Sequence, residues 1–148
     1  MMMLALASSL PAQISNVLTL NPPEKVSGKR NDVVSAAFEL VLRPGYHVNS
    51  NTPNDEYLIP LKFTWQDGST QAVDTVFPKP QSEKYEFSEK PLSVYSGTFK
   101  VETKFKILPS APSGAGIVSG KLRYQACSDK FCLPPKNIDI KVPLFVRE

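Results

Sequence analysis

Cysteine and histidine are scarce in this chain of 148 residues, which holds two of the first and one of the second. A structural zinc site takes four Cys, His or carboxylate ligands, and two thiolates supply only half of one. The other half would have to come from His47, from carboxylates or from a partner chain, and no pattern in the sequence argues for any of these. We therefore expect no metal and no cofactor.

Long apolar runs and strong charge are also absent. No segment reaches the roughly 18 consecutive apolar residues that a membrane-spanning helix needs. The formal net charge is only +3, and the lysines are dispersed without a dense basic run. The composition thus argues against a membrane span and against nucleic-acid binding. We expect a soluble monomer.

The N-terminal segment differs in composition from the rest of the chain. Residues 1–11 are small and apolar, and Ala5-Leu6-Ala7 has the form of a signal-peptidase site. We interpret residues 1–12 as the remnant of a secretory signal and residues 13–148 as one domain. Export to the periplasm or a similar oxidising compartment would allow a disulfide to persist.

Helical periodicity of ten or more residues is not found, whereas alternation of apolar and polar residues recurs along the chain. In 99–107, for example, Phe99, Val101, Phe105 and Ile107 share one face while four charged residues share the other. Such alternation indicates a strand with one buried and one exposed face. The alternation predicts six strands, at 34–42, 61–65, 73–77, 99–107, 118–126 and 138–144. Fourteen prolines fit an all-β chain with many turns, and Pro143 suggests an edge position or a strand end. The pattern favours an immunoglobulin-like antiparallel β-sandwich.

Two longer irregular segments are expected at 46–56 and 78–91, and a flexible loop at 110–116. Irregular segments as long as 46–56 and 78–91 are uncommon in compact domains and are often functional. The second long segment carries Tyr85 and Phe87 among charged residues. These aromatic side chains either anchor the loop in the core or cover a reactive group. The sequence of the loop by itself favours the first interpretation, an anchor in the core.

The two cysteines, Cys127 and Cys132, are separated by four residues and followed by the pair Pro134-Pro135. As a structural staple, a disulfide that closes so short a loop removes little entropy from the unfolded chain. It would stabilise the fold by only about 2 kcal/mol. As a redox pair, two neighbouring thiols can attack a partner disulfide and resolve the mixed disulfide. Lys130 lies between them and would favour a thiolate. The spacing alone leaves both interpretations open.

The segment from Tyr124 through Cys127 and Cys132 to Pro135 resembles the reactive segment of the N-terminal periplasmic domain of the thiol:disulfide interchange protein DsbD. Residues 44–48 resemble a Gly-Tyr-containing turn of that domain, and residues 84–95 resemble its cap-loop region. The resemblance covers roughly residues 30–146.

The resemblance implies an immunoglobulin-like domain that takes electrons from a membrane reductase and passes them to thioredoxin-like proteins. It implies that Cys127 and Cys132 are the redox pair, with Cys132 forming the mixed disulfide. Phe87, with Tyr85 as the competitor, would shield the pair until a partner docks. The residues implied to support the site are Tyr46, His47, Tyr124 and Lys130.

Two departures from the family pattern accompany the resemblance. The family form has one more residue between its cysteines, and it has aromatic residues where His47 and Asn49 stand. With the resemblance, thiol–disulfide exchange becomes the leading hypothesis, and the protein would be a component of a protein-disulfide reductase system. The alternative is an immunoglobulin-like binding or assembly module with an inert hairpin disulfide.

Overall fold

Strands make up more than half of residues 17–148, the part of the chain that the computed structural model describes, and the longest of them have alternating burial. The all-β prediction is confirmed. The proposed signal remnant at 1–12, and the first residues of the proposed domain, lie outside the described residues. Within 17–148, no helix is long and apolar enough to cross a membrane.

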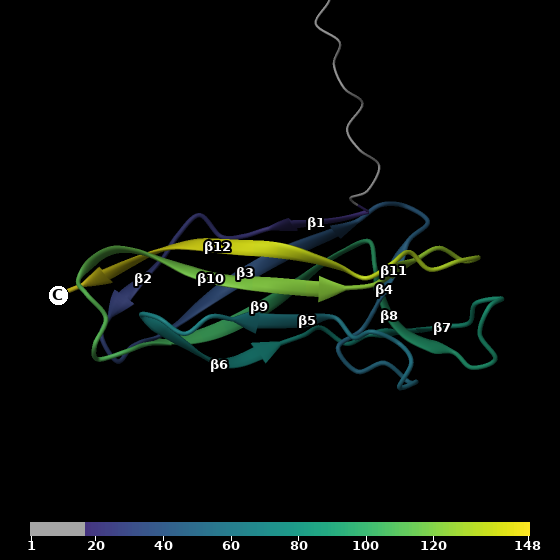
Figure 1. The fold of residues 1–148 in the computed structure, drawn as a ribbon, viewed down its shortest axis with the longest axis horizontal. Helices are drawn as coiled ribbons and strands as arrows, with labels where there is room; N and C mark the ends of the chain where they lie inside the picture. The colour runs from purple at the N-terminus through teal and green to yellow at the C-terminus, as the bar shows by residue number, and fades with distance from the viewer. Residues whose placement is uncertain (1–16) are drawn as a thin grey trace, which may run out of the picture.

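Two four-stranded sheets form the body of the sandwich (Figure 1). Sheet A has the order β1 (Leu18–Asn21), β3 (Val33–Leu42), β9 (Thr98–Ile107) and β6 (Thr70–Val76). Sheet B has the order β2 (Val26–Lys29), β12 (Lys136–Arg147), β10 (Gly114–Tyr124) and β5 (Lys62–Trp65). Buried residues of both sheets, such as Phe38 and Leu40 of sheet A and Leu122 and Val142 of sheet B, share one core cluster. The fold is an immunoglobulin-like β-sandwich, as predicted.

The six predicted strands are present, with differences at their ends. The segment 110–116 is not wholly a loop, because β10 already begins at Gly114. β12 continues to Arg147, so Pro143 lies inside the strand and, of the two predicted alternatives, the strand end is wrong. The edge position holds locally, because at Pro143 β12 pairs only with β10. β2 pairs in parallel with β12 only from Leu144 onward, so Pro143 lies just outside this pairing. Proline has no backbone N–H to donate, and this is tolerated at Pro143 because the hydrogen bonds between β12 and β2 begin only after it.

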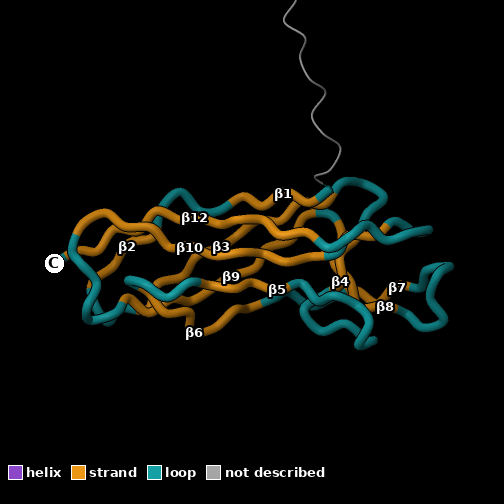
Figure 2. Tube along the Cα trace, viewed as in Figure 1, coloured by secondary structure: helices purple, strands orange, loops and turns teal. Residues whose placement is uncertain are grey.

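A third sheet closes one end of the sandwich, the end opposite the C-terminus (Figures 1 and 2). Sheet C has the order β11 (Ala126–Cys127), β4 (His47–Asn49), β8 (Leu92–Ser96) and β7 (Gln81–Glu83). β4 and β7 lie in the segments expected to be irregular, so that prediction is wrong in part. The single proton of the buried Tyr95 hydroxyl in β8 is shared between the Pro78 carbonyl at 2.7 Å and Asn51 Oδ1 at 3.1 Å. These bonds hold both long segments against sheet C.

Candidate functional site

The two cysteines face each other across a short hairpin at the edge of sheet C. Cys127 and Cys132 are joined by a disulfide, with their Cα atoms 3.9 Å apart. Two backbone hydrogen bonds flank the pair, from Ser128 N to the Phe131 carbonyl and from Leu133 N to the Ala126 carbonyl, each 2.8 Å long. The cysteines therefore occupy a non-hydrogen-bonded position, where opposing residues of an antiparallel pair approach most closely. The hairpin register explains how neighbouring strands can carry this disulfide.

Ser128 shapes the turn that separates the two cysteines. Its Oγ accepts hydrogen bonds from Lys130 N at 3.2 Å and from Phe131 N at 3.1 Å. Serine at the start of a turn commonly bonds backbone N–H groups two or three residues on. The four intervening residues thus fold as a tight turn with Asp129 and Lys130 at its tip. Sequence reasoning missed Ser128, although a Ser-Asp pair between two cysteines is itself a turn signal.

Strand pairing places His47 directly beside the disulfide. β11 pairs with β4 so that Ala126 lies opposite Val48 and Cys127 lies opposite His47. Ala126 and Val48 belong to the core cluster. Because successive side chains of a strand point to opposite faces, Cys127 and His47 share the face of sheet C that looks away from this core. The imidazole is therefore the direct cross-strand neighbour of one redox candidate.

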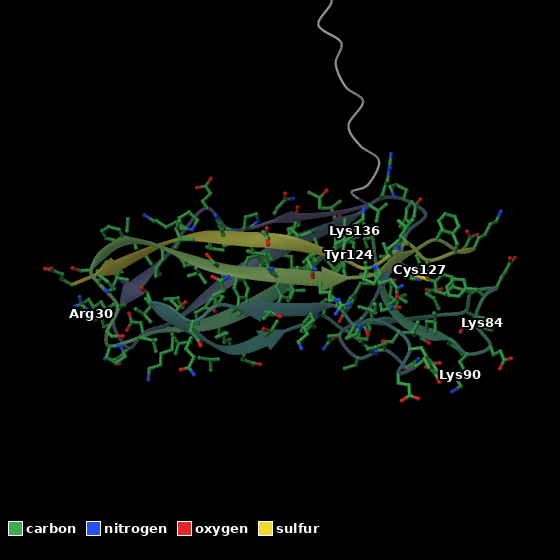
Figure 3. The ribbon with its side chains drawn as sticks, viewed as in Figure 1. Arg30, Lys84, Lys90, Tyr124, Cys127 and Lys136 are labelled. Carbon is green, nitrogen blue, oxygen red and sulfur yellow. A yellow bond between two sulfur atoms is a disulfide. The ribbon has the colours of Figure 1, made fainter. Side chains whose placement is uncertain are left out.

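Two aromatic rings of the β7–β8 loop (residues 84–91) cover His47. The Tyr85 ring stacks on the imidazole with centroids 4.0 Å apart and planes 12° from parallel. Phe87 stacks on Tyr85 at 5.5 Å and lies 6.4 Å from His47. The Lys84 ammonium helps to close this loop by donating to the carbonyls of Tyr85 and Ser88. Figure 3 shows Lys84 and Cys127 at the same end of the molecule.

Burial keeps His47 uncharged. The residue is 3% exposed, and desolvation lowers the pKa of its imidazole from 6.5 to about 4. Its Nε2 atom has no hydrogen-bond partner among the described residues. Burial also raises the pKa of Tyr85, with a smaller contribution from the nearby charge of Glu83.

The two cysteines differ in their exposure to solvent. Cys127 is 1% exposed, whereas Cys132 is exposed to solvent. Phe131, next to Cys132, exposes 54% of its surface, and Lys130 is exposed as well. An incoming partner would therefore meet Cys132 and an exposed aromatic ring before it meets Cys127.

The remaining predicted supporting residues, Tyr46 and Tyr124, pack with the core cluster. Tyr124 is buried in the core cluster at the end of β10, and burial raises the pKa of its hydroxyl (Figure 3). Tyr46 is half-buried and packs against the same cluster. Both tyrosines therefore contribute to packing of the core. Among residues 17–148, no three His, Cys, Asp or Glu side chains come together in a way that could hold a metal ion.

The sequence of residues 18–143 matches the family model described as thiol:disulfide interchange protein DsbD, N-terminal. The chain belongs to this family. Membership and the Cys127–Cys132 disulfide together support thiol–disulfide exchange as the chemistry of this domain. The family resemblance stated from the sequence is confirmed.

Solved structures of similar fold include the N-terminal periplasmic domain of ScsB from Proteus mirabilis, with a TM-score of 0.64 and 15% identity. That match covers 90% of this chain and 49% of the ScsB domain, so this chain spans about half of its length. The reduced N-terminal domain of Neisseria meningitidis DsbD matches with a TM-score of 0.46 and 18% identity, covering 76% of this chain and 77% of that one. No curated protein matches the chain by sequence.

Proposed function

We propose that this chain is an exported, periplasmic electron carrier that exchanges dithiol and disulfide with thioredoxin-like proteins through Cys127 and Cys132. The observation that carries the proposal is the unequal exposure of the pair. An inert staple needs no accessible sulfur, whereas exchange needs one sulfur that a partner thiolate can reach. In this hairpin, Cys132 is exposed to solvent while Cys127 is covered.

The reaction proceeds in two displacement steps. In the first, the Cys132 thiolate of the reduced domain attacks one sulfur of a partner disulfide, and the other partner sulfur leaves as a thiolate. In the second, the Cys127 thiolate attacks Cys132 Sγ and releases the partner's remaining sulfur, again as a thiolate. Two electrons pass to the partner, and the domain is left with its disulfide. A membrane reductase then restores the dithiol by the reverse sequence.

The hairpin geometry suits the second step. The two cysteines are opposing residues with Cα atoms 3.9 Å apart, so the resolving sulfur lies within reach without rearrangement of sheet C. The shorter spacing of this chain, relative to the family form, is compatible with that role. The four intervening residues fold as the turn shaped by Ser128, and they leave the two cysteines directly opposite each other.

Tyr85 and Phe87 serve as a cover for the buried side of the pair. Replacing Tyr85 by alanine removes the ring that stacks on His47, an interaction worth about 1 kcal/mol. We expect reduction of the disulfide by a small thiol such as dithiothreitol to accelerate roughly five-fold in Tyr85→Ala, because opening the cover becomes easier by that amount.

Tyr57→Ala is the matched control, because Tyr57 is an aromatic residue that is 85% exposed. Its rate of reduction should equal that of the unmodified chain. Stopped-flow measurement of thiol release gives the rates. Equal rates for Tyr85→Ala and the control would show that the loop does not shield the disulfide.

The reduction potential of the pair separates exchange from the alternative, a binding module with an inert disulfide. Structural disulfides of secreted proteins have potentials below about −300 mV, whereas thioredoxin-like carriers lie above that value. We expect the reduction potential of the Cys127–Cys132 pair to lie above about −300 mV.

A further inference from the structure

The unpartnered Nε2 atom of His47 is the feature that the exchange mechanism leaves unexplained. A buried polar atom without a partner destabilises the state in which it occurs by about 1–3 kcal/mol. His47 is 97% buried, and no donor or acceptor within residues 17–148 meets its Nε2 in the disulfide form. Two other buried side-chain atoms of the described residues, Asn49 Oδ1 and Trp65 Nε1, also have no partner, but only His47 lies opposite a cysteine. A redox role is one of the recognised reasons for such an atom.

The position of His47 identifies a state in which Nε2 has a partner. Its side chain lies directly opposite Cys127, on the same face of sheet C. In the disulfide, Cys127 Sγ has no proton to donate. Reduction gives Cys127 a thiol, which is a donor that faces the imidazole across the β4–β11 pair.

We propose that Nε2 of His47 accepts a hydrogen bond from the Cys127 thiol in the reduced protein, and that this bond favours the dithiol over the disulfide. The inference rests on the proposed function only in that reduction must occur. The reductant is a dithiol: it loses two electrons and two protons and becomes a disulfide, while the Cys127–Cys132 bond breaks and both sulfurs become thiols. One of the two new S–H groups then donates to Nε2.

The surroundings of the ring support this assignment. Tyr85 stacks on the imidazole and the Phe87 ring lies 6.4 Å from it, so these rings limit access of water to the buried nitrogen. The lowered pKa leaves the ring neutral near pH 7, so that a ring nitrogen without a proton can accept a hydrogen bond. The same bond would fix the orientation of the Cys127 thiol before Cys127 is needed to resolve the mixed disulfide. His47 is therefore a positioning residue for Cys127.

The test compares His47→Phe with His47→Gln. Phenylalanine keeps a flat ring that can stack on Tyr85 but offers no acceptor, whereas glutamine keeps a polar atom near the position of Nε2. We expect the equilibrium constant for reduction by glutathione to fall about ten-fold in His47→Phe, equivalent to a potential lower by ~30 mV. His47→Gln should retain most of the original value.

Thr103→Val is the matched control, because Thr103 is a fully buried polar residue of β9 in a different sheet. The equilibrium constant for reduction of Thr103→Val by glutathione should equal that of the unmodified chain. Equal constants for all variants would overturn the inference while leaving exchange intact. A pair that resists reduction in every variant would instead overturn the proposed function.

A second measurement keeps the inference testable if His47→Phe folds poorly. The chain has two cysteines, so Cys132→Ala contains a single thiol, that of Cys127. Its S–H stretching band in the infrared should lie at a lower frequency than that of a thiol without a hydrogen bond. A band at the frequency of a free thiol in Cys132→Ala would contradict the hydrogen bond.

Discussion

Cys127→Ala is expected to capture a thioredoxin-like partner as a stable mixed disulfide, whereas Cys132→Ala is not. In Cys127→Ala the remaining thiol is the exposed Cys132, and no second thiol resolves the bond that it forms. In Cys132→Ala the remaining thiol is 1% exposed and reacts only after local opening. Local opening that requires about 3 kcal/mol makes capture roughly 100-fold slower.

Capture is measured with a thioredoxin-like domain whose own resolving cysteine is replaced and whose reactive cysteine is activated as a mixed disulfide with a small aromatic thiol. Non-reducing electrophoresis at successive times then gives the rate for each variant. The double variant with both cysteines replaced is the control and should give no complex. Capture at equal rates by the two single variants would contradict the assignment of Cys132 as the attacking residue.

Acidification is expected to destabilise the oxidised protein by about 2 kcal/mol between about pH 7.5 and about pH 5 through His47 alone. Burial lowers the pKa of this imidazole from 6.5 to about 4, so the unfolded chain binds the proton more tightly than the folded one does. The contribution to stability is therefore fully present above pH 6.5 and is lost as the pH falls toward 4. The total loss reaches about 3 kcal/mol once both states are protonated.

Urea unfolding at a series of pH values measures this dependence. His47→Gln is the matched variant, because glutamine is polar but does not titrate in this range. The difference in free energy of unfolding between the two proteins should shrink or reverse by about 2 kcal/mol on going to about pH 5. Parallel pH curves for the two proteins would show that His47 is not desolvated in the folded state.

The body of the sandwich could be predicted from the sequence because its strands have one exposed face. In β9, for example, buried Val101, Thr103 and Phe105 alternate with the more exposed residues between them. Sheet C could not be predicted in this way. All three residues of β4 are buried and all three of β7 are exposed, so neither strand alternates. Short strands without alternation carry little periodic signal.

The site likewise has features that the local sequence indicates and features that it does not. The spacing of Cys127 and Cys132 pointed to a local disulfide, and the aromatic residues of the β7–β8 loop stood out in a polar segment. The place of His47 beside Cys127 depends on pairing between β4 and β11, which lie far apart in the sequence. Nothing local to either segment encodes that register. The unpartnered Nε2 could be recognised only once the pairing was known.

The reduction potential of the Cys127–Cys132 pair tests the central claim most directly. The protein is equilibrated with glutathione or dithiothreitol buffers of known potential, the free thiols are alkylated, and the two forms are separated by mass. The account predicts a potential above about −300 mV, within reach of thioredoxin-like partners at about −270 mV. A potential well below −300 mV, with the disulfide intact in every glutathione buffer, would identify a structural staple and contradict the account.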